Sequence, residues 1–378
     1  MSIAYLDWAA AAPMLPEAAE AMLPFLTERF ANPSGAHGPA RAARRALDDA
    51  RDRVAALLGV EPGEVVFTSG GTEADNLAVL GAGGDGVVVA SEVEHPAVLE
   101  AAAARGCRLA PVDRTGAVDL DALADALGPD VAVVSLMLVN NEVGTRNPLG
   151  DAVALVRERA PQAVVHTDAV QAACWLDLAD AAAGADLISI SAHKFGGPKG
   201  VGALGVRRGV RLAPRLVGGG QERERRSGTP NVAGAVAMGV AAELTAARRV
   251  EVAARVASLR DRLVDGLLAA LAGLVEEAVE TVPRPLKTPG NAHVCLGGLE
   301  SEALLFLLDR HGVCASAASA CASGALQRSG VLEAMGVPER LARGAVRFTL
   351  GWGSSDADVD RALEAAPAAV AQLTGARR

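Results

Sequence analysis

Short apolar runs alternate with helix-like stretches over most of the chain. Between residues 15 and 250, runs of consecutive apolar residues predict buried strands at 64–68, 86–90, 131–139, 164–167, 187–191 and 202–206. Apolar residues at helical spacing between them predict helices at 41–58, 72–80, 96–105 and 149–159. Alternating helices and apolar strands are typical of a mainly parallel sheet covered on both faces. We therefore predict an α/β fold for this part of the chain.

The pattern changes after residue 232. Residues 232–271 read as long helical segments, and they are followed by strands at 291–296 and 346–350 and helices at 302–310 and 356–373. This mixture predicts a smaller α+β domain. We assign residues 15–250 to a large domain, and residues 1–14 together with 251–378 to a small one. The Pro-rich segment 282–289 is interpreted as a surface connection.

Composition narrows the class of protein. The 378 residues are 51% hydrophobic and 21% charged, with a formal net charge of -9, and no basic patch of the kind that binds nucleic acid stands out. The N-terminus lacks a secretory pattern, and the apolar run at 131–139 is far too short to span a bilayer. The five cysteines are odd in number and form no CxxC pair, which favours a reducing cytoplasm over a disulfide framework or a zinc site.

Lysine is rare in this chain, with only three lysines among 36 lysines and arginines. One of them, Lys194, follows the apolar strand 187–191 in the sequence Ser191-Ala192-His193-Lys194. In an open parallel sheet, ligands bind beyond the carboxyl ends of the strands. Arginine cannot replace an amine that must deprotonate and condense with an aldehyde. Lys194 is therefore our candidate anchor for pyridoxal phosphate.

Three further side chains suit that cofactor. Asp168 follows another strand and can pair with the pyridine nitrogen, although a helix N-cap is the simpler reading of it alone. Gln171 would share a helical face with Asp168 and can donate to the phenolic oxygen of the ring. His95 follows the strand at 86–90, where a flat imidazole can stack on the ring, although a lone histidine is more often structural.

The turn at 68–73, Thr-Ser-Gly-Gly-Thr-Glu, joins a predicted strand to a helix. Free N–H groups at such a helix start bind phosphate, and Gly71 and Thr72 suit close approach and a hydroxyl contact. It is not a Walker motif, because no Gly-Lys-Ser/Thr follows. A second glycine-rich loop, at 218–229, can supply further phosphate ligands, and the amides at 140–141 suit ring or substrate contacts.

Cys321 lies among small residues at 315–324, which is typical of an exposed loop. A thiol in such a loop can reach an active site and act as a nucleophile. A small apolar-like cysteine within a helix is the alternative reading of it. Cys314 is the competing nucleophile, but it follows Gly312-Val313 as if in a buried strand.

Together these motifs identify a family. The chain resembles the cysteine desulfurases of the iron–sulfur and nitrogen-fixation type, within the class V aminotransferases, from Tyr5-Leu6-Asp7 to the segment 347–351. The motifs that carry the resemblance are those at 69–73, 140–142, 168–171, 191–194, 226–229 and 319–321. The resemblance implies a pyridoxal-phosphate-dependent transferase fold of type I, with a sheet of the seven-stranded type.

The resemblance also implies residue roles. Lys194 would hold the cofactor as a Schiff base and move the Cα proton, with His95 on the ring, Asp168 at its nitrogen and Gln171 at its phenolic oxygen. The phosphate would be held by Gly71, Thr72, Ser191 and His193, and by Thr229 reaching the partner subunit's phosphate in a homodimer. The substrate carboxylate would be bound by Asn141 and Arg347, with Asn32 nearby. In this chain Ala9–Ala12 replaces threonines that are frequent in the family, so their hydroxyls are absent.

The implied reaction converts L-cysteine to L-alanine. Cys321 attacks the substrate sulfur and passes the resulting persulfide to a protein acceptor, for iron–sulfur assembly, tRNA thiolation or a dedicated biosynthetic pathway. Two alternatives share the sequence features: a selenocysteine lyase or other lyase of the class V fold, and a non-catalytic protein that keeps the fold for complex formation. Three observations separate these alternatives from the desulfurase. Loss of activity in Cys321→Ala and the ratio of the rates with cysteine and selenocysteine distinguish it from a lyase. The colour of the purified protein distinguishes it from a non-catalytic protein.

Overall fold

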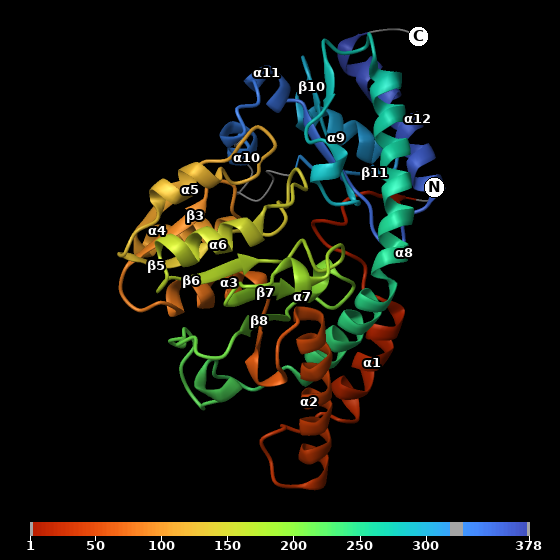
Figure 1. The fold of residues 1–378 in the computed structure, drawn as a ribbon. Coiled ribbons are helices and arrows are strands. Elements are labelled where there is room, and N and C mark those ends of the chain that lie inside the picture. The colour runs from red at the N-terminus through yellow and green to blue at the C-terminus, as the bar shows by residue number, and fades with distance from the viewer. Residues whose placement is uncertain (1–2, 318–327, 376–378) are drawn as a thin grey trace.

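A seven-stranded sheet forms the middle of the molecule (Figure 1). The computed structural model describes residues 3–317 and 328–375. The strand order is β2-β8-β7-β6-β5-β3-β4, and only β8 runs against its two neighbours. The strands are β2 (Val65–Thr68), β3 (Val87–Ser91), β4 (Cys107–Ala110), β5 (Val131–Ser135), β6 (Val164–Asp168), β7 (Leu187–Ser191) and β8 (Gly202–Val206). The predicted α/β fold with a mainly parallel sheet is confirmed.

The sheet is buried on both faces, as the apolar strands predict. Successive strand residues belong to different hydrophobic clusters: Val88 and Val133 lie in one, and Val89 and Val134 in the other. Side chains alternate between the faces of a strand, so each face has its own core. The helices of this layer are α1 (Pro16–Thr27), α2 (Gly38–Leu58), α3 (Gly71–Gly81), α4 (Pro96–Arg105), α5 (Leu120–Ala126), α6 (Leu149–Arg159) and α7 (Leu178–Ala181).

A second layer is built around a three-stranded antiparallel sheet with the order β12-β10-β9. We call it the C-terminal layer, although β1 (Ala4–Tyr5) joins it by pairing with β11 (Val313–Cys314). Its other elements are β9 (Ala278–Glu280), β10 (Asn291–Leu296), β12 (Ala345–Thr349), α9 (Ser301–Arg310), α10 (Gly330–Ala334), α11 (Glu339–Ala342) and α12 (Asp356–Thr374). A cluster that includes Leu6, Val294 and Val346 forms its core.

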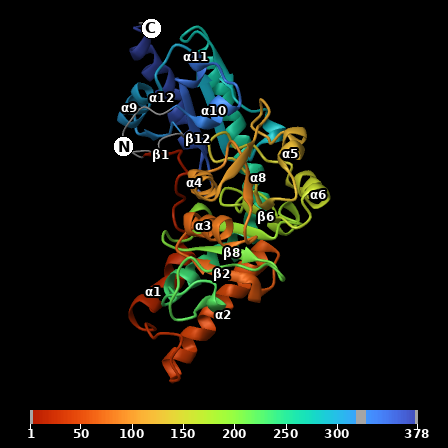
Figure 2. The same cartoon turned by 90° about the vertical axis from the view of Figure 1, so that its left-hand side faces the viewer.

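One long helix, α8 (Val232–Leu271), runs alongside both layers (Figures 1 and 2). Its first part, up to Ala242, packs into a core of the seven-stranded sheet, and Val256 to Leu271 packs into the core of the C-terminal layer. No helix within residues 3–317 and 328–375 is long and apolar enough to cross a membrane.

Two details of the sequence-based prediction differ from the structure. The strand predicted at 131–139 ends at Ser135. Beyond it, the N–H groups of Leu136 and Leu138 still donate to the β6 carbonyls of His166 and Asp168, but the Met137 N–H donates to the Glu94 carboxylate (2.7 Å) and not to a strand. The segment 282–289 is a surface connection only in part: Pro283, Pro285 and Leu286 are exposed, but Val282, Lys287 and Thr288 are buried. It packs there because its backbone bonds to the turn at 144–146, as in the 3.0 Å bond from Thr288 N–H to the Gly144 carbonyl.

Candidate active site

Lys194 lies directly after β7, at the end of a short 3-10 turn formed by Ala192–Lys194. Its amine donates to the backbone carbonyls of Ala9 (2.7 Å) and Ala10 (2.9 Å). The chain then turns at Gly196, whose φ of +87° favours glycine and where a Cβ would stand 2.7 Å from Leu15 Cγ. The side chain is half-buried, so its amine is held in place yet open to a ligand.

Asp168 ends β6, next to β7 in the sheet. Its carboxylate accepts a 2.8 Å bond from Val170 N–H, so the N-cap-like role expected of it is present. Burial raises the pKa of this carboxyl group, while the nearby His95 and Lys194 lower it. A protonated ring nitrogen would give the buried carboxylate the positive partner that its ionised form requires.

Gln171 and Lys194 share an acceptor. The Gln171 side-chain amide donates to the Ala9 carbonyl at 2.9 Å, the same oxygen that accepts from Lys194. The backbone at Ala9 and Ala10 therefore contacts the site even though these residues carry no hydroxyl. Sequence reasoning missed this contact, because a backbone carbonyl leaves no mark in the residue types.

His95 is both a structural and a candidate catalytic residue. It is the N-cap of α4, and its Nδ1 accepts a 3.1 Å bond from Ala97 N–H. That bond leaves the hydrogen of the neutral ring on Nε2. Burial lowers the pKa of His95, Asp168 counteracts this, and Lys194 lowers the pKa further. The ring is therefore predominantly neutral near pH 7, in the form suited to stacking on a cofactor.

The start of α3 and the end of β7 form a polar cradle. No side chain caps α3 at Gly70, so its first N–H groups face outward. A Cβ on Gly70 would stand 3.8 Å from Ser191 Oγ, and one on Gly71 would stand 2.8 Å from Val170 Cγ2. Ser191 Oγ lies 2.9 Å from His193 Nδ1, and burial lowers the pKa of His193 to about 4. Backbone N–H groups, hydroxyls and a neutral imidazole suit a phosphate monoester.

These residues fit pyridoxal 5'-phosphate. The cradle could receive its phosphate, Lys194 would offer an amine to its aldehyde, and Asp168 would offer a carboxylate to its ring nitrogen. The fit rests on the donor set of the cradle and on the uncapped N–H groups at the start of α3. Among the described residues, no group of histidine, cysteine, aspartate and glutamate side chains could hold a metal ion.

Arg347 and Asn141 lie next to each other where the C-terminal layer meets this site. Arg347 belongs to β12 and is 4% exposed. Its Nη1 donates to the Asn141 carbonyl (2.6 Å) and its Nη2 to Asp7 Oδ1 (2.8 Å). A guanidinium has five N–H donors, so N–H groups remain for a carboxylate. Sequence reasoning did not assign Asp7 a role, although it lies in the Tyr5-Leu6-Asp7 motif.

A largely apolar pocket, open to solvent, adjoins Lys194 and has about 810 Å³ of empty space, the solvent at its mouth included. All three tryptophans of the chain, Trp8, Trp175 and Trp352, line it. Lys194 and Asn141 also line it, which connects the anchor and the substrate side. Apolar walls lower the local dielectric constant, so charges at this site interact more strongly than they would in water.

The structure does not bring every candidate residue to Lys194. Thr229 lines a separate pocket together with Ser69. Asn32 lies on the exposed loop between α1 and α2, where its side chain accepts from Ser34 N–H (3.0 Å). Cys321 lies outside the described residues. Its competitor, Cys314, is only half-buried in the short strand β11, so the expectation of a buried strand there is met only in part.

A buried polar cluster behind Asp168 was also missed. His166 bonds through Nδ1 to Ser135 Oγ (2.8 Å) and through Nε2 to Ser189 Oγ (2.9 Å). Asp75 Oδ1 lies 3.6 Å from the same Nε2, and burial, with Asp168 nearby, raises the pKa of Asp75 well above its usual value. The sequence signal was a histidine within the otherwise apolar run at 164–167.

Known proteins resemble this chain over nearly its whole length. Residues 4–362 match the aminotransferase class-V family. The chain is 44% identical to the cysteine desulfurase of Gluconacetobacter diazotrophicus, over 99% of this chain and 94% of that protein. It is 45% identical to the IscS-like cysteine desulfurase of Mycobacterium tuberculosis, over 98% of this chain and 97% of that protein. Among solved structures, a NifS-like protein has a TM-score of 0.90 at 33% identity, covering 99% of this chain and 100% of that one. SspA in complex with cysteine has a TM-score of 0.77 at 29% identity, covering 92% and 98%.

Proposed function

Because this chain belongs to the class-V aminotransferase family and is a pyridoxal-phosphate-dependent cysteine desulfurase with a type I transferase fold, we propose that Lys194 anchors the cofactor and that Cys321 receives the sulfur. The observation that carries the anchor is the Lys194 amine, held by two carbonyls beside a buried Asp168 and an uncapped helix start. The cofactor supplies an electron sink that stabilises negative charge at the substrate Cα.

The chain's own residues then have distinct tasks. Lys194 Nζ takes the proton from the substrate Cα and returns one, as an amine near its target can do. Asp168 balances the charge of the ring nitrogen, His95 stacks on the ring, and Gln171 faces its phenolic oxygen. The phosphate is held by Gly71, Thr72, Ser191 and His193.

The substrate is L-cysteine, the ligand that accompanies the related SspA. Arg347 and Asn141 bind its carboxylate, and Asn32 contributes from its loop. The thiolate of Cys321 attacks the substrate sulfur, so the carbon–sulfur bond breaks as a sulfur–sulfur bond forms. Alanine leaves, and the persulfide on Cys321 passes to a protein acceptor. The names of the relatives favour an acceptor in iron–sulfur assembly.

The active form in this proposal is a homodimer in which Thr229 contacts the phosphate of the partner subunit. Its support is two large apolar side chains that are left exposed on loops: Phe30 is 79% and Val217 81% exposed. Mixing Lys194→Ala with Thr229→Ala protomers tests this arrangement. In the mixed dimer one phosphate site keeps both its lysine and the partner's threonine, whereas neither parent dimer has such a site, so activity should rise above both parents.

We retain the division into residues 15–250 and residues 1–14 with 251–378 as part of this proposal, supported by the separate core of the C-terminal layer. We also propose a cytoplasmic location. The four described cysteines, at 107, 174, 295 and 314, are free thiols, as a reducing compartment favours.

Cys321→Ala tests the sulfur acceptor, with Cys314→Ala as its matched control. Alanine release from L-cysteine should vanish in the first variant and persist in the second, while both keep the visible absorbance of the bound cofactor. Turnover at the normal rate in Cys321→Ala contradicts the persulfide step. The ratio of kcat/KM for cysteine and selenocysteine then tests the desulfurase against the lyase.

A further inference from the structure

Lys287 is the one buried lysine among the chain's three. Its side chain is 0% exposed, whereas Lys199 is exposed and Lys194 belongs to the active site. It lies between the short 3-10 turn Arg284–Leu286 and β10. A lysine is rarely buried without a partner, so its place in the fold needs a cause.

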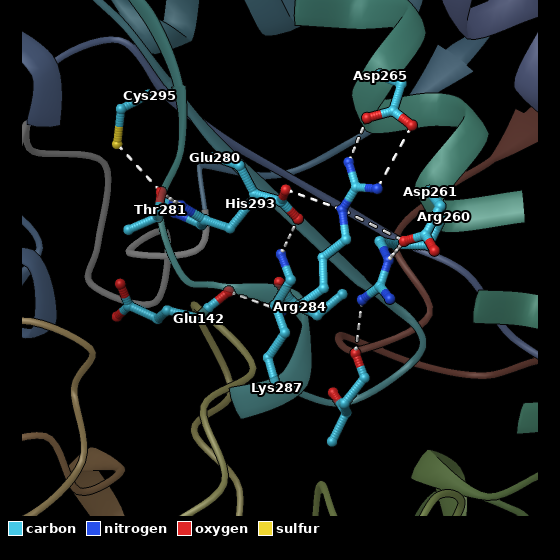
Figure 3. A network of polar contacts seen from close by, with 12 residues as sticks. Glu142, Arg260, Asp261, Asp265, Glu280, Thr281, Arg284, Lys287, His293 and Cys295 are labelled. Carbon is cyan, nitrogen blue, oxygen red and sulfur yellow. Dashed lines mark hydrogen bonds and ion pairs between the residues drawn. The ribbon is translucent and has the colours of Figure 1, made fainter. Parts of the chain in front are cut away.

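Glu280 on β9 is that partner, at 2.7 Å from Lys287 Nζ (Figure 3). Arg284 contacts the other oxygen of Glu280 at 3.1 Å and also pairs with Asp265 on α8. Burial lowers the pKa of Lys287 to about 8, with Arg260 and Arg284 also lowering it and Glu280 opposing them. The ion pair with Glu280 therefore favours the charged amine, and removing one member would leave a buried charge without its partner.

The backbone around Lys287 is fastened to the turn that carries Asn141. Lys287 pairs with Thr145 as an antiparallel bridge. Thr288 N–H donates to the Gly144 carbonyl (3.0 Å), and the Asn291 amide donates to the Glu142 carbonyl (2.9 Å). These contacts join the 142–145 turn to the segment that leads into β10.

The strand that follows, β10, pairs with β12, the strand that carries the other substrate residue. In the β10–β12 ladder, His293 lies opposite Arg347, and Asn291 lies opposite Thr349. Arg347 donates in turn to the Asn141 carbonyl at 2.6 Å. Asn141 and Arg347 are thus both attached, one through its turn and one through its strand, to the stretch of chain that begins at Lys287.

We propose that Lys287 is a positioning residue for substrate binding. Its ion pair with Glu280 holds the segment 285–291 against the turn that follows Asn141. It thereby sets the positions from which Asn141 and Arg347 bind the substrate carboxylate. This inference rests on the proposed function, in which these two residues bind that carboxylate. Lys287 itself contacts neither substrate nor cofactor.

The test compares Lys287→Met with Glu280→Gln and with the double variant, all as holoenzymes. Glu280→Gln is isosteric, so it keeps the test open if Lys287→Met does not fold. Glu339→Gln, in the exposed pair with Arg343, is the control. The readouts are KM and kcat for alanine release from L-cysteine, and equilibrium binding of L-alanine and of cysteamine, followed by the absorbance of the cofactor. Cysteamine is cysteine without its carboxylate.

Each single variant should weaken L-alanine binding and raise KM by about tenfold, equivalent to about 1.4 kcal/mol. The kcat should change less than KM, and cysteamine binding should stay as in the wild type. The double variant should recover part of the loss, because no buried charge is left unpaired. Glu339→Gln should match the wild type.

Unchanged L-alanine binding in folded single variants overturns the inference, and so does an equal loss for cysteamine, which would indicate a merely structural role. Arg347→Gln separates this failure from that of the proposed function. If Arg347→Gln binds L-alanine normally, the assignment of the carboxylate site is wrong and the inference falls with it. If Arg347→Gln binds weakly while Lys287→Met binds normally, only the inference is overturned.

Discussion

Replacing Glu222 by Gln should destabilise the protein more than any exposed charge change. Glu222 and Arg51 form a two-pronged ion pair at 2.7 and 2.8 Å, with both side chains 6% exposed. The same carboxylate accepts from Phe67 N–H at 3.0 Å, which ties the loop to β2 just before the phosphate cradle. A glutamine oxygen can replace only part of these contacts, and its NH2 group cannot accept any of them.

The loop that this carboxylate holds is strained. Glu222, Arg223 and Glu224 have φ values of +48°, +57° and +64°, in the region that glycine favours. Each such residue costs about 1 kcal/mol or more. Removing one partner of a buried ion pair costs about 3–5 kcal/mol, and we take about 3 kcal/mol because glutamine keeps one acceptor. For 378 residues the entropy of unfolding is about 0.8 kcal/mol/K, so Tm should fall by about 4 °C.

The assay is thermal unfolding of the holoenzyme at fixed protein and cofactor concentrations, since both shift Tm. Asp130→Asn, in the exposed pair with Arg108, is the control and should leave Tm unchanged. Trypsin should also cleave faster after Arg223 in Glu222→Gln, because the strained loop is released. A Tm within about 1 °C of the wild type, together with unchanged cleavage, would refute this reasoning.

Three further variants probe the site and its surroundings. Burial raises the pKa of Glu94 to about 8 from 4.5, so the stability that its protonated form contributes is complete below pH 4.5 and lost as pH rises through 8. Glu94→Gln should therefore raise Tm relative to the wild type more at pH 8.5 than at pH 5.5. An equal difference in Tm at both pH values contradicts the assignment. Gly71→Ala places a Cβ 2.8 Å from Val170 Cγ2 and should weaken pyridoxal phosphate binding about tenfold in a fluorescence titration, with normal affinity as the contrary result. Asp7→Asn removes the charged partner of Arg347 and should alter KM for L-cysteine more than kcat, whereas a change confined to kcat would count against the carboxylate role.

The sequence predicted the sheet well because its strands are apolar on both sides. The ranges 187–191 and 202–206 match β7 and β8 without change. The short strand β4 was not predicted, because three of its four residues, beginning with Cys107, are exposed and give no apolar run. Local periodicity detects burial, and an edge strand is only partly buried.

The candidate site was predictable where a residue type has few alternative uses. Three features stand out in the chain: Lys194 after one strand, Asp168 at the end of the neighbouring strand, and the glycine-rich start of a helix at 68–73. Two other contacts leave no such signal: the bonds from Lys194 to the carbonyls of Ala9 and Ala10, and the pair of Asp7 with Arg347. They join segments that lie about 185 and 340 positions apart in the sequence. Such contacts follow from the tertiary fold, which no local pattern of residues specifies.

The length of α8 has a mechanical consequence. Its 40 residues span about 60 Å at 1.5 Å per residue, so a one-degree rotation at one end moves the other by about 1 Å. Its first part is embedded beside Lys194's sheet and its last part beside Arg347's sheet. The helix thus fixes the distance between the two parts of the proposed catalytic centre. Replacing exposed residues near Val250 by glycine should make the middle of α8 more flexible and loosen substrate alignment, without replacing Lys194, Asn141 or Arg347.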